Sequence, residues 1–207
     1  ALLRDKVAAK SVNLLDSDTP NDIYADVANK LLDKLKEIKD NVNSTEIDKK
    51  NATNWMKLGI DRKCVKPSVM TLPYGSKRYS CGNFIQDYLK EHYSKDFLWQ
   101  HFSIGNSPND CILKISVWLS KYLWQAIENT LTSAIIGMDF LTKVAKCASK
   151  NNQYLEWTTP AGLLVRQDYK SRKKQFVRTE LFGSIVKTTV NVDTEELDNA
   201  RQVSGIA

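Results

Sequence analysis

Four side chains recur at intervals of four residues in the order Arg62, Lys66, Met70 and Tyr74. Residues spaced by four lie along one side of an α-helix, so a helix here would carry two cations at one end of a stripe and an aromatic ring at the other. The eight residues from Lys66 to Tyr74 span about 12 Å at the helical rise, which is the scale of a nucleoside triphosphate. Cations suit phosphates and a ring suits a sugar and base, so the stripe predicts a nucleotide site.

The residues around this stripe modify the prediction. Gly75 follows Tyr74 directly and would let a backbone or a template base approach where a Cβ would obstruct it. Pro67 and Pro73 disfavour or interrupt helical hydrogen bonding, so we expect the stripe to bend. The alternative is a solvated surface, because basic pairs spaced by four are common on exposed helices.

Positive charge is concentrated in two segments. The net charge is +6, residues 62–78 carry five Lys and Arg with no acid, and residues 166–178 carry six against Asp168 alone. Aromatic residues lie within both segments, as they do in many proteins that bind single-stranded nucleic acid. A solvated face is the commoner reading of any single basic run, but the two together favour an anionic partner such as nucleic acid.

Apolar periodicity predicts a mainly α chain with a small β portion. We expect a helix that is capped at Thr19, has Pro20 as its first residue and ends near residue 40. The polar segment 41–53 is predicted to be a mobile loop or a poorly ordered short helix. A second capped start at Ser107–Pro108 opens a helical run to about residue 145, and the length of this run predicts a break around residues 128–132.

The last third of the chain has the pattern of β-strands. A strand, a turn and a strand are expected over 154–165, and a hairpin from Lys174 to Val192 with its turn at Gly183–Ser184. A two-stranded ribbon fits the DNA major groove and has little core of its own. Its candidate DNA-binding side chains are the basic residues Arg172, Lys173, Lys174 and Arg178.

Composition excludes several classes of protein. Hydrophobic residues make up 42% and charged residues 26% of the chain, which excludes a wholly disordered protein. The four cysteines form no CxxC pair and only two histidines are present, which argues against a zinc site. No run approaches the roughly 18 apolar residues of a membrane span. We therefore expect a soluble intracellular protein with reduced thiols.

The segment from Arg62 to Ser76 resembles the fingers-helix signature of the single-subunit DNA-directed RNA polymerases of bacteriophages, which have more distant relatives in mitochondria. The signature runs as an Arg, three residues, a Lys, two residues and then Val-Met-Thr-Leu-x-Tyr-Gly-Ser. The resemblance continues through Trp157–Gly162 and Gln167–Tyr169 to the closing Ser204–Ala207, and so covers essentially the whole chain.

This resemblance implies a fingers region of a right-handed polymerase over residues 1–207. It implies a mainly helical part over 1–150, a β-hairpin region over 151–192 that is similar to the promoter-specificity loop, and a tail over 193–207. The implied activity is ribonucleotidyl transfer to an RNA 3′ end with Mg²⁺. The implied partners are template and promoter DNA, ribonucleoside triphosphates, nascent RNA and the palm and thumb of the parent chain, in the cytoplasm of a bacterial host rather than in a mitochondrion, with no membrane.

Residue roles follow from the resemblance where the residues match. Arg62 and Lys66 resemble the pair that holds the triphosphate of the incoming nucleotide. Tyr74 resembles the tyrosine that closes the nucleotide pocket and favours ribose, so Lys66 and Tyr74 are the expected catalytic residues. Tyr24 resembles a tyrosine that lines this pocket.

The resemblance also implies contacts with the template, and it has departures. Gly75 and Tyr79 lie where the family places its template strand, whereas Pro67 stands where the family often has a second basic residue. Neither palm motif that supplies a metal-binding aspartate is found, so we expect this segment alone to be inactive. The alternative is a stand-alone nucleic-acid-binding or regulatory module with a fingers-like fold.

Overall fold

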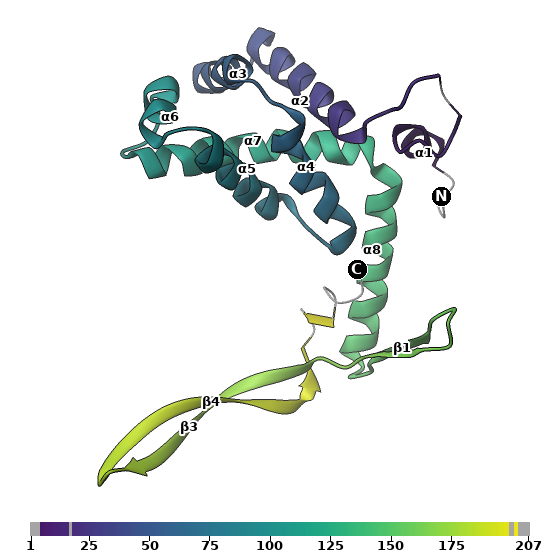
Figure 1. Cartoon of the computed structure of the whole chain (residues 1–207), viewed down its shortest axis with the longest axis vertical. Coiled ribbons are helices and arrows are strands. Elements are labelled where there is room, and N and C mark those ends of the chain that lie inside the picture. Colours follow the sequence, from purple (N-terminus) through teal and green to yellow (C-terminus); the bar gives the residue numbers. More distant parts are fainter. Residues whose placement is uncertain (1–4, 17, 199–200, 203–207) are drawn as a thin grey trace. The chain divides into compact units, whose positions relative to one another are not determined.

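Helices occupy the chain up to residue 150, and strands follow (Figure 1). The computed structural model describes residues 5–16, 18–198 and 201–202. Its helices are α1 (Lys6–Ser11), α2 (Ile23–Asp40), α3 (Glu46–Leu58), α4 (Arg62–Thr71), the 3₁₀ turn η1 (Leu72–Tyr74), α5 (Arg78–His92), α6 (Lys95–Phe102), α7 (Pro108–Thr130) and α8 (Thr132–Lys150). Two antiparallel hairpins follow, which confirms the expected mainly α fold with a small β portion.

The chain divides into two compact units at Gly137–Met138, inside α8. The first unit has a core to which α2 through α7 all contribute, and α7 packs against α2, α5 and α6. The largest fully buried side chains of this core are Trp55, Phe102, Leu31, Leu35, Ile85, Leu89, Leu98, Ile112, Ile115, Leu119, Leu123 and Ile127. The helical unit therefore has enough buried apolar surface to hold its own shape.

The start of α2 differs from the sequence prediction. Asp22 is the N-cap, because its side chain accepts a hydrogen bond from the backbone N–H of Tyr24, and Thr19 and Pro20 lie outside the helix. The apolar stripe along α2 is buried as expected, and the helix ends at Asp40. The predicted cap was therefore wrong by three residues, although the helix itself and its end were correct.

Of the two alternatives for residues 41–53, the structure has the helix rather than the loop, and this helix, α3, begins at Glu46 and extends beyond the predicted segment to Leu58. Thr45 caps this helix by accepting from the backbone N–H of Asp48, and its hydroxyl donates to the Asp48 carboxylate at 2.8 Å. Trp55 is fully buried and packs edge-on against Phe102, with ring centres 5.4 Å apart. Tertiary packing of the tryptophan stabilises a helix whose polar first half has weak propensity of its own.

The long helical run breaks where the sequence predicts. Ser107 caps α7 by accepting from the N–H of Asp110, and Pro108 is the first helical residue. The helix α7 ends at Thr130 and α8 begins at Thr132, with Leu131 between them. The N-terminal cap and the interruption within residues 128–132 are both confirmed.

The strands of the second unit form two separate hairpins. The first pairs β1 (Leu155–Thr158) with β2 (Leu164–Gln167), and the second pairs β3 (Lys170–Leu181) with β4 (Ser184–Leu197). The β3–β4 ribbon is longer than predicted, and its turn lies at Phe182–Gly183, one residue earlier than expected. Both turn residues have positive φ, 51° and 75°, as a two-residue turn that matches strand twist requires.

Candidate nucleotide and nucleic-acid site

The helix α4 is fixed to the core by one face. Cys64, Val65 and Val69 are buried, and Asp61 caps the helix by accepting from the N–H of Cys64 at 2.9 Å. Burial raises the pKa of the Cys64 thiol to about 12, so this cysteine is a packing residue rather than a nucleophile. The α-helix continues through Pro67 as far as Thr71 despite the backbone donor that proline lacks.

The predicted stripe is helical up to Met70 and then tightens. Arg62, Lys66 and Met70 lie on α4 at intervals of four residues, whereas Tyr74 ends the three-residue 3₁₀ turn η1, in which Pro73 is the second residue. The spacing of one α-helical turn is therefore lost between Met70 and Tyr74. The Tyr74 side chain is 73% exposed, so its ring is free to contact a ligand.

Gly75 has a structural role that the sequence reading did not identify. It has φ of +80° and ends the turn in the left-handed region. Its N–H donates to the carbonyl of Leu72, and the N–H of Ser76 donates to the carbonyl of Thr71. This pair of bonds is the Schellman motif, in which glycine is favoured because it has no Cβ. Gly75 therefore fixes the chain direction immediately after Tyr74.

Arg62 and Tyr24 are brought together although 38 positions separate them in the sequence. The Cζ atom of Arg62 lies 4.9 Å from the centre of the Tyr24 ring, and its Nε lies 2.6 Å from an oxygen of Asp22. Partial desolvation raises the pKa of Asp22, but the hydrogen bonds from Arg62 and from the N–H of Tyr24 outweigh it and hold that pKa below its ordinary value. Asp22 was not expected to take part, because neither its spacing nor its charge predicts this contact.

Lys66 is the second cation of the stripe and is partly buried. Within the part of the chain that the structure describes, its ammonium makes no hydrogen bond and no ion pair. A partly desolvated cation without a counterion is suited to binding an anion.

The first turn of α5 carries Arg78 and Tyr79, and the Tyr79 side chain is 82% exposed. Both residues line an open pocket of about 280 Å³ between α5 and α7. The other residues of this pocket are Gly82, Asn83, Gln86, Leu113, Val117 and Ser120. A ring, a guanidinium and amides around one hollow are groups that can contact a nucleobase.

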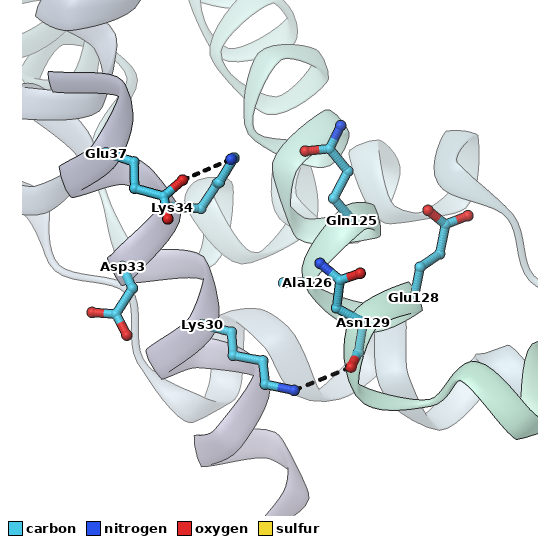
Figure 2. A pocket seen from close by; sticks show the side chains of 8 residues that line it. All are labelled: Lys30, Asp33, Lys34, Glu37, Gln125, Ala126, Glu128 and Asn129. Carbon is cyan, nitrogen blue, oxygen red and sulfur yellow. Dashed lines mark hydrogen bonds and ion pairs between the residues drawn. The ribbon is translucent and has the colours of Figure 1, made fainter. Parts of the chain in front are cut away.

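A larger pocket of about 520 Å³ lies between α2 and α7, and the sequence did not predict it (Figure 2). Its charges are already engaged within the protein. Lys34 pairs with Glu37 at 2.7 Å, and the Lys30 ammonium donates to the carbonyl of Asn129 at 3.2 Å. We assign no ligand to it, because internal pairing leaves little net charge to attract one.

The four basic residues predicted on the ribbon do not share one face. Side chains alternate along a strand, and cross-strand partners share a face. The cationic face consists of Arg172, Lys174, Phe176, Arg178, Glu180, Ile185, Lys187, Thr189, Asn191 and Asp193. The valine face consists of Lys173, Gln175, Val177, Thr179, Leu181, Ser184, Val186, Thr188, Val190 and Val192. Lys173 therefore points away from the other three predicted residues.

Two arginines of the cationic face have different cross-strand partners, one an acid and the other a lysine. Arg172 is neutralised by Asp193, with 2.9 Å between Nε and Oδ1. Arg178 lies directly opposite Lys187, and among the described residues neither forms an ion pair. Opposed like charges destabilise a hairpin, so this pair favours an anion that lies against both side chains.

Among the described residues, no group of three or more His, Cys, Asp and Glu side chains is arranged to hold a metal ion. No helix in the same residues combines the length and the apolar character needed to cross a membrane.

The chain is similar in sequence to known proteins along its whole length. The family profile described as DNA-dependent RNA polymerase matches residues 1–207. The DNA-directed RNA polymerase of Enterobacteria phage K11 is 29% identical, in an alignment that covers 100% of this chain and 26% of the phage protein. T7 RNA polymerase of Escherichia phage T7 is also 29% identical, with the same coverage of both chains.

A mitochondrial relative shows the same similarity. The mitochondrial DNA-directed RNA polymerase of Mus musculus is 28% identical over 99% of this chain and 15% of its own length. The chain thus spans about a quarter of the length of the two phage relatives and less of the mitochondrial one. Since the family profile covers every residue, as the signature from Arg62 to Ser76 predicted, the chain belongs to the DNA-dependent RNA polymerase family.

Proposed function

We propose that this chain is the fingers region of a DNA-directed RNA polymerase, in which it selects and positions the incoming ribonucleotide and contacts template and promoter DNA. The observation that carries the proposal is the arrangement of α4 and η1. Arg62 and Lys66 lie one turn apart on α4, and the exposed ring of Tyr74 follows at the end of η1. This order of cations and ring supports a triphosphate at one end and a nucleoside at the other.

Lys66 and Arg62 have different tasks in this proposal. Lys66 supplies a compact charge with no counterion among the described residues, so it neutralises charge that develops as the phosphate bond breaks. Arg62 supplies a planar fork that binds phosphate oxygens in pairs. Tyr74 packs against the sugar, and its hydroxyl senses the ribose 2′-OH, while Tyr24 lines the pocket beside Arg62.

Template contacts are proposed for the residues that follow Tyr74. Gly75 turns the chain without a side chain that would obstruct a template base. Tyr79 offers an exposed ring on which a base can stack, and base–aromatic stacking contributes about 1–3 kcal/mol per base. The family match supports a DNA template as a partner in general, and the exposure of Tyr79 and the turn at Gly75 support these two roles.

Promoter contacts are proposed for the ribbon. Its cationic face presents Arg172, Lys174 and Arg178 together with Asn191, whose amide can read adenine in the major groove. Lys173 lies on the opposite face, so we propose for it at most a peripheral contact with a phosphate.

Catalysis belongs to the full-length chain in this proposal. Ribonucleotidyl transfer requires Mg²⁺, the nascent RNA and the palm and thumb of the parent chain. In this proposal the palm supplies the residues that bind Mg²⁺. The similarity to the phage enzymes supports action in the cytoplasm of a bacterial host.

Single-nucleotide incorporation by the full-length chain tests the nucleotide site. Lys66→Ala is expected to raise the KM for the ribonucleotide at least tenfold (about 1.4 kcal/mol) and to lower kcat, because the unpaired cation acts on both bound and reacting phosphates. The control is Lys90→Ala, since Lys90 is an exposed lysine in the last turn of α5, remote in sequence from the stripe. Equal kinetics for the two variants would contradict the proposal.

The alternative is a stand-alone nucleic-acid-binding module, because the like-charged pair on the ribbon supports nucleic-acid binding whether or not the protein is catalytic. In that case the intact gene product would not extend RNA but would bind nucleic acid with an affinity that falls steeply with salt. Extension of RNA by the intact product would exclude it.

A further inference from the structure

One carboxylate joins the start of α2 to the start of α4. Oδ1 of Asp22 accepts from the N–H of Tyr24 at 3.0 Å, which caps α2. Its other oxygen, Oδ2, accepts from Nε of Arg62 at 2.6 Å, and Arg62 is the first residue of α4. The same side chain therefore sets the beginning of one helix and contacts the candidate phosphate-binding arginine on another.

This contact determines which part of the guanidinium stays available. The hydrogen bond occupies Nε, while neither Nη of Arg62 bonds to any residue that the structure describes. The Tyr24 ring lies against the guanidinium, 4.9 Å from Cζ to the ring centre. The ring restricts the plane of the guanidinium and the Nε bond restricts its rotation, so the edge formed by the two Nη groups has a defined direction.

Stability alone is a weak explanation of the ion pair. The side chains of Arg62 and Asp22 are 52% and 36% exposed, and exposed ion pairs contribute little to folding. Capping does not need the negative charge either, because asparagine is as good an N-cap as aspartate. The charge and position of Asp22 therefore point to an effect on Arg62 itself.

We propose that Asp22 and Tyr24 are positioning residues that hold Arg62 with both Nη groups directed at the phosphates of the incoming nucleotide. This inference rests on the proposed role of Arg62 in binding the triphosphate. The competing account is that Asp22 neutralises Arg62 and repels phosphate. The two accounts predict opposite changes in nucleotide affinity when the carboxylate is removed.

The test is the KM for a ribonucleotide in the full-length chain with Asp22→Asn. Asparagine keeps the cap of α2 but holds the guanidinium less firmly, so KM is expected to rise three- to tenfold with kcat within twofold. Tyr24→Leu removes the ring that restricts the guanidinium plane, and is expected to raise KM in the same range. The matched control is Asp33→Asn, which breaks the 2.9 Å pair with Lys36 on the same helix and should leave KM unchanged.

A double-mutant cycle separates positioning from a general loss of structure. If Asp22 acts through Arg62, Asp22→Asn adds no further rise in KM when Arg62 is already alanine. Independent, multiplicative effects would overturn the inference. A fall in KM for Asp22→Asn would also overturn it, in favour of the neutralisation account.

The outcomes also distinguish this inference from the function on which it rests. If Arg62→Ala leaves KM unchanged, the proposed role of Arg62 is wrong and the positioning inference falls with it. If Arg62→Ala raises KM but Asp22→Asn and Tyr24→Leu do not, Arg62 keeps its role and only the positioning inference is overturned.

Discussion

Large apolar side chains are mostly buried in the helical unit but exposed on the β3–β4 ribbon. Leu31 and Leu119 on the helices are fully buried, whereas Phe176 and Ile185 on the ribbon are 77% and 72% exposed. The helical unit is shaped by its own core, so it can hold Arg62, Lys66 and Tyr74 in a fixed arrangement. The ribbon is shaped by backbone pairing and its turn, which leaves side chains on both of its faces available to a partner.

Removing a large core side chain tests whether the helical unit depends on its core. Trp55→Ala should lower the free energy of unfolding by about 3–5 kcal/mol, because it removes a fully buried ring and leaves a cavity. Val190→Ala on the ribbon should change it by less than about 0.5 kcal/mol. Urea unfolding followed by far-UV circular dichroism measures both. Similar losses for the two variants would remove the contrast between the regions.

The next effect tests whether the turn shapes the ribbon. Gly183→Val places a β-branched residue at φ of +75° and should destabilise the ribbon by about 1–2 kcal/mol, without affecting the helices. Phe182→Asn is the control, because asparagine tolerates positive φ. Hydrogen exchange of the ribbon amides is the measurement. Unchanged protection in Gly183→Val would show that pairing alone is sufficient.

A smaller effect concerns acid stability of the helical unit. The hydrogen bond from Nε1 of Trp118 at 2.7 Å lowers the pKa of Asp48 below 3.8, against the opposing effect of burial. A carboxyl whose pKa is lower in the folded state stabilises the fold at pH values above its pKa in the unfolded state. This stabilisation is lost as the pH falls through the pKa of the folded state. The free energy of unfolding, measured by denaturant titration at several pH values between 2 and 6, should therefore change less with pH in Asp48→Asn than in the unchanged chain. An unchanged slope would show that the ionised carboxylate does not stabilise the unit.

Single lysine substitutions on the ribbon distinguish its two faces. Lys174→Ala should reduce the slope of log affinity for DNA against log salt by about 1, as loss of one phosphate contact does. Lys173→Ala should change the slope less, because it lies on the valine face. Filter binding at several salt concentrations measures both variants of the full-length chain. A larger change for Lys173 would reverse the assignment of faces.

Sequence patterns correctly predicted those helix ends and hairpins that depend on residues close together in the chain. The cap at Ser107 and the break beside Leu131 followed from capping chemistry and helix length, and the hairpins followed from alternation. The sequence left a loop and a short helix open for residues 41–53, and it did not predict the full length of α3, because Trp55 stabilises this helix through a tertiary contact with Phe102. No local pattern carries that information.

The candidate site was predicted in part for the same reason. The order of Arg62, Lys66 and Tyr74 lies in one short segment, so their sequence spacing indicated a shared surface. The contact of Asp22 with Arg62 joins residues 40 positions apart. The position of Lys173 on the face opposite Arg172 and Lys174, by contrast, follows from alternation along a strand that had been predicted to begin only at residue 174. Only the first of these depends on three-dimensional placement that sequence spacing does not encode.

The proposed selection of the ribonucleotide by the end of α4 and η1 depends on the Tyr74 hydroxyl, and Tyr74→Phe in the full-length chain removes that hydroxyl. This change removes one hydroxyl from an exposed ring and leaves its packing intact. We predict that the preference for ribonucleotides over deoxyribonucleotides, measured as a ratio of kcat/KM, falls at least tenfold (about 1.4 kcal/mol) while incorporation of ribonucleotides continues. An unchanged ratio would contradict the assignment of Tyr74 and with it the nucleotide site.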